Sequence, residues 1–284
     1  MSLKSGLRNK AKSIREFISK SQKKIGLSFK AEGHIYFLLD KEGKLRKVKK
    51  SVTGFVANYY NKFDKEKISL AKAKGNREVQ EEIIKEWDNI RIKASTEGTY
   101  VHEILENYLI DIFKIGKKKN KNLLGSKNLD VNMKISAGVK FIEEMQSINA
   151  ELIDTEILVA DQQNSLVGMV DCAFLGKKNG EYVIFLSDWK TNKNKSFQIN
   201  PWTQKMKPPF SSYNDYAPNH YQIQLSLYCC LLKKMLAGGP FENMKIYTGI
   251  IVHLDKNGSY KQYFLREKVR EITTKIYSEL PALE

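Results

Sequence analysis

The dipeptide Asn179-Gly180 constrains this sequence more than any other feature, because it lies between two stretches rich in Val, Ile, Leu and Phe. Asn-Gly favours the two-residue type I′ hairpin turn, since both central residues of that turn need a positive φ angle. The sequence therefore predicts an antiparallel hairpin in which Lys178 pairs with Glu181.

This turn also sets the pairing of two aspartates further along the hairpin. Counting back from the turn, Asp171 is expected directly opposite Asp188. Two carboxylates in that position have Cβ atoms about 4.5–5.5 Å apart and repel each other. A divalent cation between them removes the repulsion, and carboxylate oxygens suit Mg²⁺ or Mn²⁺. The alternative is a pair of ordinary polar residues at the wet end of a strand.

Lys190 is expected on the same face as Asp188, because side chains alternate along a strand. A positive charge beside the carboxylates suits the orientation of a water molecule or the stabilisation of a phosphorane-like charge. Asp-x-Lys alone is a weak signal, so this interpretation depends on the predicted register.

A predicted helix over residues 98–115 carries His102 and Glu106 four residues apart, and therefore on one face. Apolar residues lie close to that face, so it can pack inward. Alone, this pattern favours a histidine whose hydrogen bonds are satisfied in the core or at the surface.

A second predicted helix, over residues 219–237, is apolar apart from a few polar side chains that include Gln222, Gln224 and Tyr228. Gln224 and Tyr228 share one face, and buried amide and phenol groups need hydrogen-bond partners. A phosphate oxygen is one candidate partner, and the two side chains pairing with each other is the alternative.

The remaining pattern predicts an α+β protein. Apolar periodicity predicts helices at 7–24, 65–74, 76–94, 98–115, 131–148 and 219–237 and one at the C-terminal end, a hairpin over 34–50, a helix start at Ser51, and strands at 151–160, 166–175, 181–188 and 244–253. The C-terminal half thus reads α-β-β-β-α-β. We expect effectively a single domain: residues 1–50 form a basic helix and hairpin, 51–130 are helical, and 131–284 form the core.

The charge balance indicates a polyanionic partner. The chain has 48 Lys and Arg against 32 Asp and Glu, a net charge of +16. Residues 1–50 alone hold 15 of these cations against 4 acids. Nucleic acid is the partner that this distribution favours, and a solubility device is the alternative. No run of about 18 apolar residues is present, so we expect no membrane span.

Taken in order, these motifs resemble the PD-(D/E)XK nuclease superfamily, and specifically its RecB-like exonuclease branch. That branch has a Gly-x-x-x-His-x-x-x-Glu helix, a Gly-x-x-Asp strand, an Asp/Glu-x-Lys strand and a Gln-x-x-x-Tyr helix, which are matched here by Gly98, His102 and Glu106, by Gly168 and Asp171, by Asp188 and Lys190, and by Gln224 and Tyr228. The strands, and the Ser51-Val52-Thr53 segment after a hairpin with Tyr36, look like phage and mitochondrial genome maintenance exonucleases. The resemblance covers about residues 30–255.

The resemblance implies a restriction-endonuclease-like αβββαβ core, a mixed central sheet flanked by helices, with residues 51–130 as a helical arch. It implies that His102, Asp171 and Asp188 ligate one or two Mg²⁺ or Mn²⁺ ions. Lys190 would position the attacking water. Glu156 stands where the family often has a further carboxylate, or it is a surface charge at a strand end. The residues expected to face the substrate are Gln222, Gln224, Tyr228, Ser51 and Thr53.

The implied activity is a metal-dependent DNA exonuclease in replication, recombination or repair, acting on single-stranded ends without sequence preference. The basic N-terminal segment and the lysines of 116–121 would contact phosphates, and aromatic residues of 191–219 would stack on bases or pack within their loop. We expect no nucleotide cofactor, since no Walker A motif is present. Three cysteines cannot supply a four-cysteine iron–sulfur cluster.

Two other functions stay open. A structure-specific or restriction-like endonuclease would use the same core, and a non-catalytic nucleic-acid-binding module would use only its charge. The expected location is the cytoplasm of a bacterial or phage-infected cell, because three cysteines suggest a reducing compartment. Mitochondrial import is less expected, since Glu16 and the many lysines do not suit a transit peptide.

Overall fold

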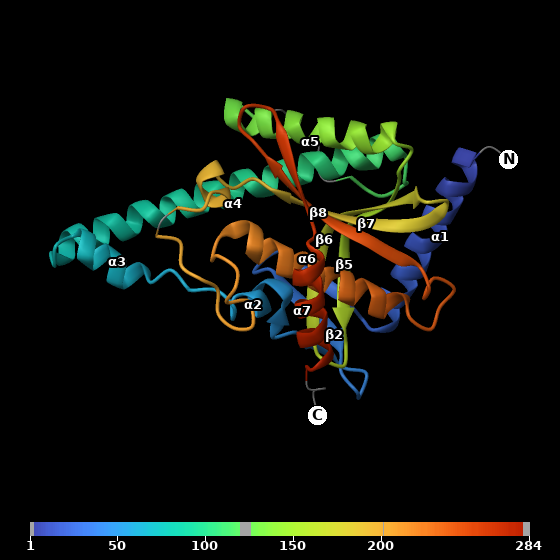
Figure 1. The fold of residues 1–284 in the computed structure, drawn as a ribbon, viewed down its shortest axis with the longest axis horizontal. Coiled ribbons are helices and arrows are strands. Elements are labelled where there is room, and N and C mark those ends of the chain that lie inside the picture. Colours follow the sequence, from blue (N-terminus) through green and yellow to red (C-terminus); the bar gives the residue numbers. More distant parts are fainter. Residues whose placement is uncertain (1–2, 120–125, 201, 281–284) are drawn as a thin grey trace.

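The computed structural model describes residues 3–119, 126–200 and 202–280. Within these residues the chain forms seven α-helices, a six-stranded mixed sheet and a small antiparallel sheet of three strands (Figure 1). The predicted α+β class with a helical N-terminal region is confirmed. None of the described helices has the length and apolar character needed to cross a membrane.

The elements follow one another in this order: α1 (Leu3–Lys24), β1 (Ser28–Lys30), β2 (Ile35–Leu39), β3 (Leu45–Lys47), β4 (Lys50–Ser51), α2 (Val52–Val56), α3 (Lys65–Lys72), α4 (Arg77–Phe113), α5 (Leu129–Ser147), β5 (Glu151–Asp161), β6 (Leu166–Lys178), β7 (Glu181–Lys190), the 3₁₀ helix η1 (Asn194–Phe197), α6 (Ala217–Leu236), β8 (Lys245–Leu254), β9 (Tyr260–Phe264) and α7 (Glu267–Ser278).

The large sheet has the order β5-β6-β7-β8-β9, with β4 beside the first residues of β6. Strands β5, β6 and β7 form the predicted antiparallel meander, and α6 then leads to β8, which runs parallel to β7. The sequence predicted a turn and then the last helix, and it missed the edge strand β9. It also missed β1, which pairs with β2.

Two apolar clusters hold helices against the two faces of this sheet (Figure 1). Ile14 of α1 and Leu227 of α6 share one cluster with Ile184 of β7. Phe141 of α5 shares the other cluster with Trp189 of β7. Alternate residues of one strand therefore serve opposite layers, as the expected alternation requires.

The hairpin register predicted from the turn is confirmed. Asn179 and Gly180 have φ angles of 51° and 83°, and Lys178 pairs with Glu181. The ladder continues without a shift to the pair of Cys172 with Ser187, one residue before the two aspartates.

The two helices predicted at 76–94 and 98–115 are one helix, α4, of 37 residues. The sequence Ser-Thr-Glu-Gly at 95–98 resembles a helix end. The helix nevertheless continues across these residues, which make tertiary contacts. Glu97 accepts a hydrogen bond from Asn128 (2.7 Å), and a Cβ at Gly98 would lie 3.0 Å from Thr191 Oγ1. The glycine is therefore explained by close packing. Residues 65–97, which we call the arm, extend beyond the sheet on the left of Figure 1.

Two glycine-to-alanine changes test this description of the backbone. Gly180→Ala should destabilise the protein by about 1 kcal/mol, because its φ angle is left-handed. Gly6→Ala should stabilise it by about 0.5–1 kcal/mol, because Gly6 lies inside α1 with open space around it. Urea unfolding measures both, and effects of the same sign would contradict the turn or the helix.

Candidate metal centre

A cavity of about 770 Å³ lies where the ends of β6 and β7 meet α2, α4 and α6. All the predicted site residues except Gln222 line it, namely Ser51, Thr53, His102, Glu156, Asp171, Asp188, Lys190, Gln224 and Tyr228. Seven elements of the chain thus bring residues far apart in sequence to one place.

Three of these residues form a cluster with the composition of a metal site. His102, Glu156 and Asp171 each offer one ligand atom, and these atoms lie within 4.8 Å of one another. His102 Nδ1 is 3.3 Å from Asp171 Oδ1. Octahedral Mg²⁺ binds oxygen at about 2.1 Å, which places its ligand atoms about 3–4 Å apart. Small side-chain movements would let these three groups hold such an ion.

The backbone of β5 directs Glu156 toward Asp171. The neighbouring pairs Thr155 with Cys172 and Ile157 with Val170 place Glu156 across from Asp171. Glu156 itself has a φ of 46°, which is rare for a residue other than glycine and interrupts regular pairing there. The unusual backbone conformation of β5 thus lies at Glu156, the residue whose carboxylate is the candidate metal ligand.

Asp171 lies where β6 passes the end of the β7 ladder. In place of a further ladder bond, the backbone N–H of Trp189 donates a 2.6 Å hydrogen bond to Asp171 Oδ2. The sequence predicted two opposed, repelling aspartates, and this hydrogen bond relieves part of that repulsion.

Asp188 forms an ion pair with Lys190 and is not part of the three-residue cluster. The expected sharing of a cation between Asp171 and Asp188 stays a prediction, and both side chains line the cavity. Lys190 Nζ also lies 4.4 Å from the centre of the Tyr221 ring. Tyr221 is a cavity neighbour that the sequence motifs did not include, and its signal is a position one turn before Gln224 on α6.

Burial and neighbouring charges separate the pKa values of the carboxyl groups. Burial and then the charges of Asp171 and Glu106 raise the pKa of Glu156 to about 8. Burial raises the pKa of Asp188 to about 6, because the charge of Asp171, which also raises it, offsets part of the lowering by Lys190. Burial also acts to raise the pKa of Asp171, but His102, Lys190 and the Trp189 N–H together hold it below its usual value. Asp171 is thus the carboxyl group of the three that loses its proton most readily.

Four of the five residues expected to face the substrate line the cavity, and Gln222 does not. Gln224 donates a 2.7 Å hydrogen bond to Tyr228 Oη, which is the internal pairing left open as the alternative. Ser51 caps α2, and its Oγ lies 3.1 Å from Thr53 Oγ1.

Gln222 lies away from the cavity, where it donates to the Phe264 carbonyl and accepts from the Arg266 N–H. It joins α6 to β9 and α7, and we correct its predicted role accordingly.

Gly168 of the predicted motif is explained by packing at the base of the cavity. A Cβ there would lie 2.4 Å from Tyr228 Cε1 and 3.1 Å from Val52 Cγ2. Only glycine lets the start of β6 approach α2 and α6 this closely.

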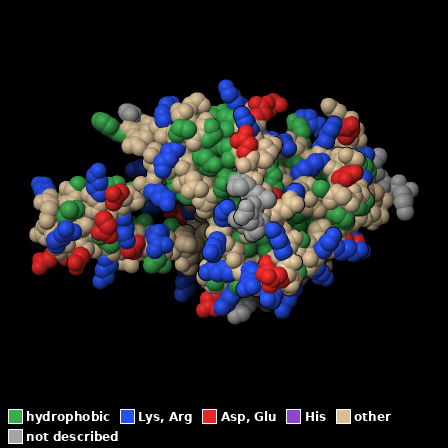
Figure 2. Space-filling view, turned by 90° about the horizontal axis from the view of Figure 1, so that it is seen from below, with side chains coloured by type: hydrophobic (Ala, Val, Ile, Leu, Met, Phe, Trp, Pro, Cys, Tyr) green, Lys and Arg blue, Asp and Glu red, His purple; other side chains and the backbone are tan. Residues whose placement is uncertain are grey.

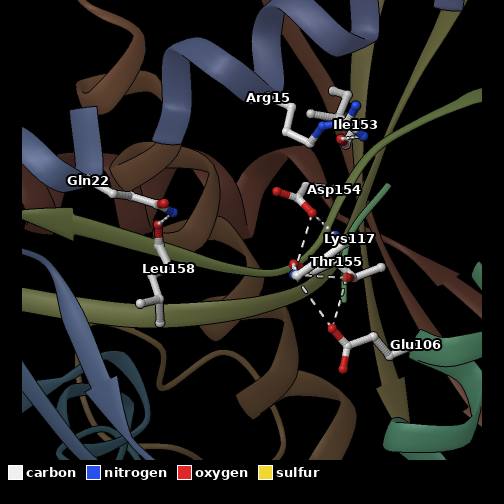
Figure 3. Close-up of polar contacts among 8 residues, drawn as sticks. All are labelled: Arg15, Gln22, Glu106, Lys117, Ile153, Asp154, Thr155 and Leu158. Atoms are coloured by element: carbon white, nitrogen blue, oxygen red, sulfur yellow. Dashed lines mark hydrogen bonds and ion pairs between the residues drawn. The ribbon is translucent and has the colours of Figure 1, made fainter. Parts of the chain in front are cut away.

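Glu106, which shares a helix face with His102, contacts β5 and the segment after α4. It accepts a 3.0 Å hydrogen bond from Thr155 Oγ1, and Lys117 Nζ lies 3.5 Å from its carboxylate (Figure 3). Lys117 also donates to the Thr155 carbonyl at 2.6 Å and lies 3.5 Å from Asp154. These contacts hold β5 immediately before Glu156, so the sequence missed a positioning role for Lys117.

The aromatic residues of 191–219 separate into packed and exposed members. Phe210 is fully buried, and the Phe197 ring stacks on His253 at 3.7 Å. Trp202 is 89% exposed. The packed-loop alternative therefore holds for Phe210 and Phe197. Of the lysines at 116–121, Lys121 lies outside the described residues.

Comparison with known proteins adds no relative: the chain matches no protein-family model and no curated protein. The functional interpretation therefore depends on the residues of the cavity and on the motif resemblance.

Glu156→Gln tests the charge balance of the centre through stability. The pKa of Glu156 is raised in the folded protein, so wild type loses stability as pH rises from about 4.5 to about 8. In chelator, the variant should therefore melt a few degrees higher than wild type at pH 8.5, with little difference at pH 4.5.

Excess Mn²⁺ should reverse this order at pH 8.5, because wild type gains more from binding. Glu86→Gln, an exposed change on α4, is the matched control and should show neither effect. A pH-independent difference between Glu156→Gln and wild type would contradict the proposed repulsion.

Proposed function

We propose that this protein is a Mg²⁺- or Mn²⁺-dependent deoxyribonuclease that hydrolyses phosphodiester bonds, with single-stranded ends as its preferred substrate. One observation carries the proposal: a cavity in which a His102, Glu156 and Asp171 cluster lies beside the buried ion pair of Asp188 and Lys190. Metal-ligand oxygens next to an ammonium group are the components that phosphodiester hydrolysis needs.

The chemistry divides among these residues. A bound divalent ion supplies Lewis acidity and lowers the pKa of water. His102, Glu156 and Asp171 would hold it, and Asp188 is the neighbouring carboxylate available to a first or second ion. Lys190, supported by Asp188 and the Tyr221 ring, is the donor for the attacking water or for the negative charge on the phosphate.

The finer fold assignment supports the same proposal. Helix α5, the meander of β5, β6 and β7, helix α6 and strand β8 follow the αβββαβ order of a restriction-endonuclease-like core. Asp171 lies within β6 beside the end of β7, where Lys190 is the last residue, and both side chains line the cavity. This juxtaposition supports the motif resemblance.

The charge distribution supports DNA as the substrate. The chain carries a net charge of +16, and Lys and Arg side chains are spread over the arm and the body on the face drawn in Figure 2. Cations in this number favour sequence-independent binding to phosphates. We propose roles in DNA replication, recombination or repair on this basis and on the motif resemblance.

A nuclease assay on linear and circular single-stranded DNA, with Mn²⁺ or with EDTA, tests the proposal. Asp171→Asn and Lys190→Ala should each lower kcat at least a hundredfold, because each removes a group that acts on the reacting phosphate or its water. Lys256→Ala, in an exposed turn, is the matched control and should retain full activity.

Each outcome of this assay has a separate meaning. Mn²⁺-dependent loss of the linear strand alone supports the exonuclease. Cleavage of the circle would assign the same centre to an endonuclease. No cleavage of either strand, with DNA binding retained, would contradict catalysis and leave a binding module.

A further inference from the structure

A second hollow, of about 630 Å³, lies between the arm and the segment that follows β7. We call it the arm groove, and it is lined by Phe63, Ile68, Lys72, Trp87, Ile90, Arg91, Ala94, Glu97, Lys134, Thr191, Asn192, Lys193 and Ser196. It adjoins the catalytic cavity, because Gly98 lines that cavity and packs against Thr191 of the groove.

Two aromatic rings mark this groove. Phe63 and Trp87 meet edge to face with their centres 5.3 Å apart, and Phe63 remains 64% exposed. Exposed aromatic side chains beside cations are the groups on which unpaired bases stack in single-strand-binding proteins. Packing of α3 against α4 explains part of the burial of the Trp87 side chain. The ring of Phe63 remains exposed and can contact a ligand.

The charges around these rings favour an anionic ligand. Lys72, Arg91, Lys134 and Lys193 line the groove together with one acid, Glu97, which already accepts a hydrogen bond from Asn128. Arg91 also lies 3.7 Å from Asp88, so the three lysines carry most of the positive charge. Lys72 Nζ lies 5.2 Å from the centre of the Trp87 ring, so an ammonium group sits directly beside the aromatic surface. Aromatic faces next to cations suit a nucleobase and its phosphates.

We propose that the arm groove binds an unpaired nucleobase of a single-stranded DNA whose scissile phosphate lies in the catalytic cavity. The inference rests on the proposed action on DNA and names the part of the protein that recognises the strand. Phe63 and Trp87 stack on the base, and Lys72 and Lys193 contact its flanking phosphates.

The length of α4 sets how far this base lies from the reaction. Trp87 precedes His102 by 15 residues, which is about 22 Å along the helix at 1.5 Å per residue. At about 3.4 Å per stacked nucleotide, this separation corresponds to at most about six nucleotides. Strands too short to cover it should not use the groove.

Binding of fluorescent oligodeoxynucleotides in EDTA tests the proposal without catalysis. Trp87→Ala and Phe63→Ala should each weaken binding of a 20-nucleotide single strand about tenfold, the size expected for a lost base stack. Ile92→Ala removes an exposed apolar side chain of α4 that does not line the groove, and it should bind as wild type does.

An abasic 20-mer separates stacking from charge. It should bind wild type more weakly than the normal strand, and the Trp87→Ala and Phe63→Ala effects should vanish on it. Equal losses on normal and abasic strands, or equal binding by Phe63→Ala and Ile92→Ala, would overturn the proposal. Phe63 is largely exposed, so its variant keeps the test valid if Trp87→Ala unfolds the arm.

These outcomes are independent of the nuclease proposal. Loss of the contrast between normal and abasic strands would remove the groove and leave catalysis untouched. Retention of that contrast in a protein that shows no Mn²⁺-dependent cleavage would remove the catalytic assignment and leave the groove.

Discussion

Mutual repulsion among three neighbouring carboxylates governs how the charged groups of the cavity are arranged. Glu156, Asp171 and Asp188 line one cavity, and unpaired buried charge is costly. Each carboxylate is stabilised differently. His102 and the Trp189 N–H favour the ionised form of Asp171, and the others have raised pKa values. A divalent cation is the ligand that removes the remaining repulsion, which is why we interpret the cavity as a metal centre.

The fold supplies these groups through separate layers. Trp189 packs into the cluster between the sheet and α5, so its backbone N–H is held rigidly against Asp171. Helix α4 carries His102. Lys117, in the segment after that helix, donates to the Thr155 carbonyl and holds β5 next to Glu156. On the other side of β5, Arg15 and Gln22 of α1 donate to the carbonyls of Ile153 and Leu158 (Figure 3). The strand with the distorted ligand position is therefore held from both sides.

The hairpin, its register and the αβββαβ order were predictable, because an Asn-Gly turn and apolar alternation are local signals. The continuity of α4 was not, since packing of Gly98 against Thr191 outweighs a sequence that resembles a helix end. In the site, the motif spacing singled out His102 and Asp171, and the structure places their side chains 3.3 Å apart. The pairing of Asp188 with Lys190 follows from the alternation of side chains along β7. The roles of Tyr221 and Lys117 depend on side-chain contacts between distant segments, which the motif spacing does not encode.

The most direct test is a crystal structure with Mn²⁺, in which anomalous scattering locates the ion. The account predicts one peak about 2.0–2.3 Å from a nitrogen of His102 and from one oxygen each of Glu156 and Asp171. No peak at saturating Mn²⁺ would contradict the metal centre. A peak ligated by Asp188 without Glu156 would contradict the assignment of its ligands.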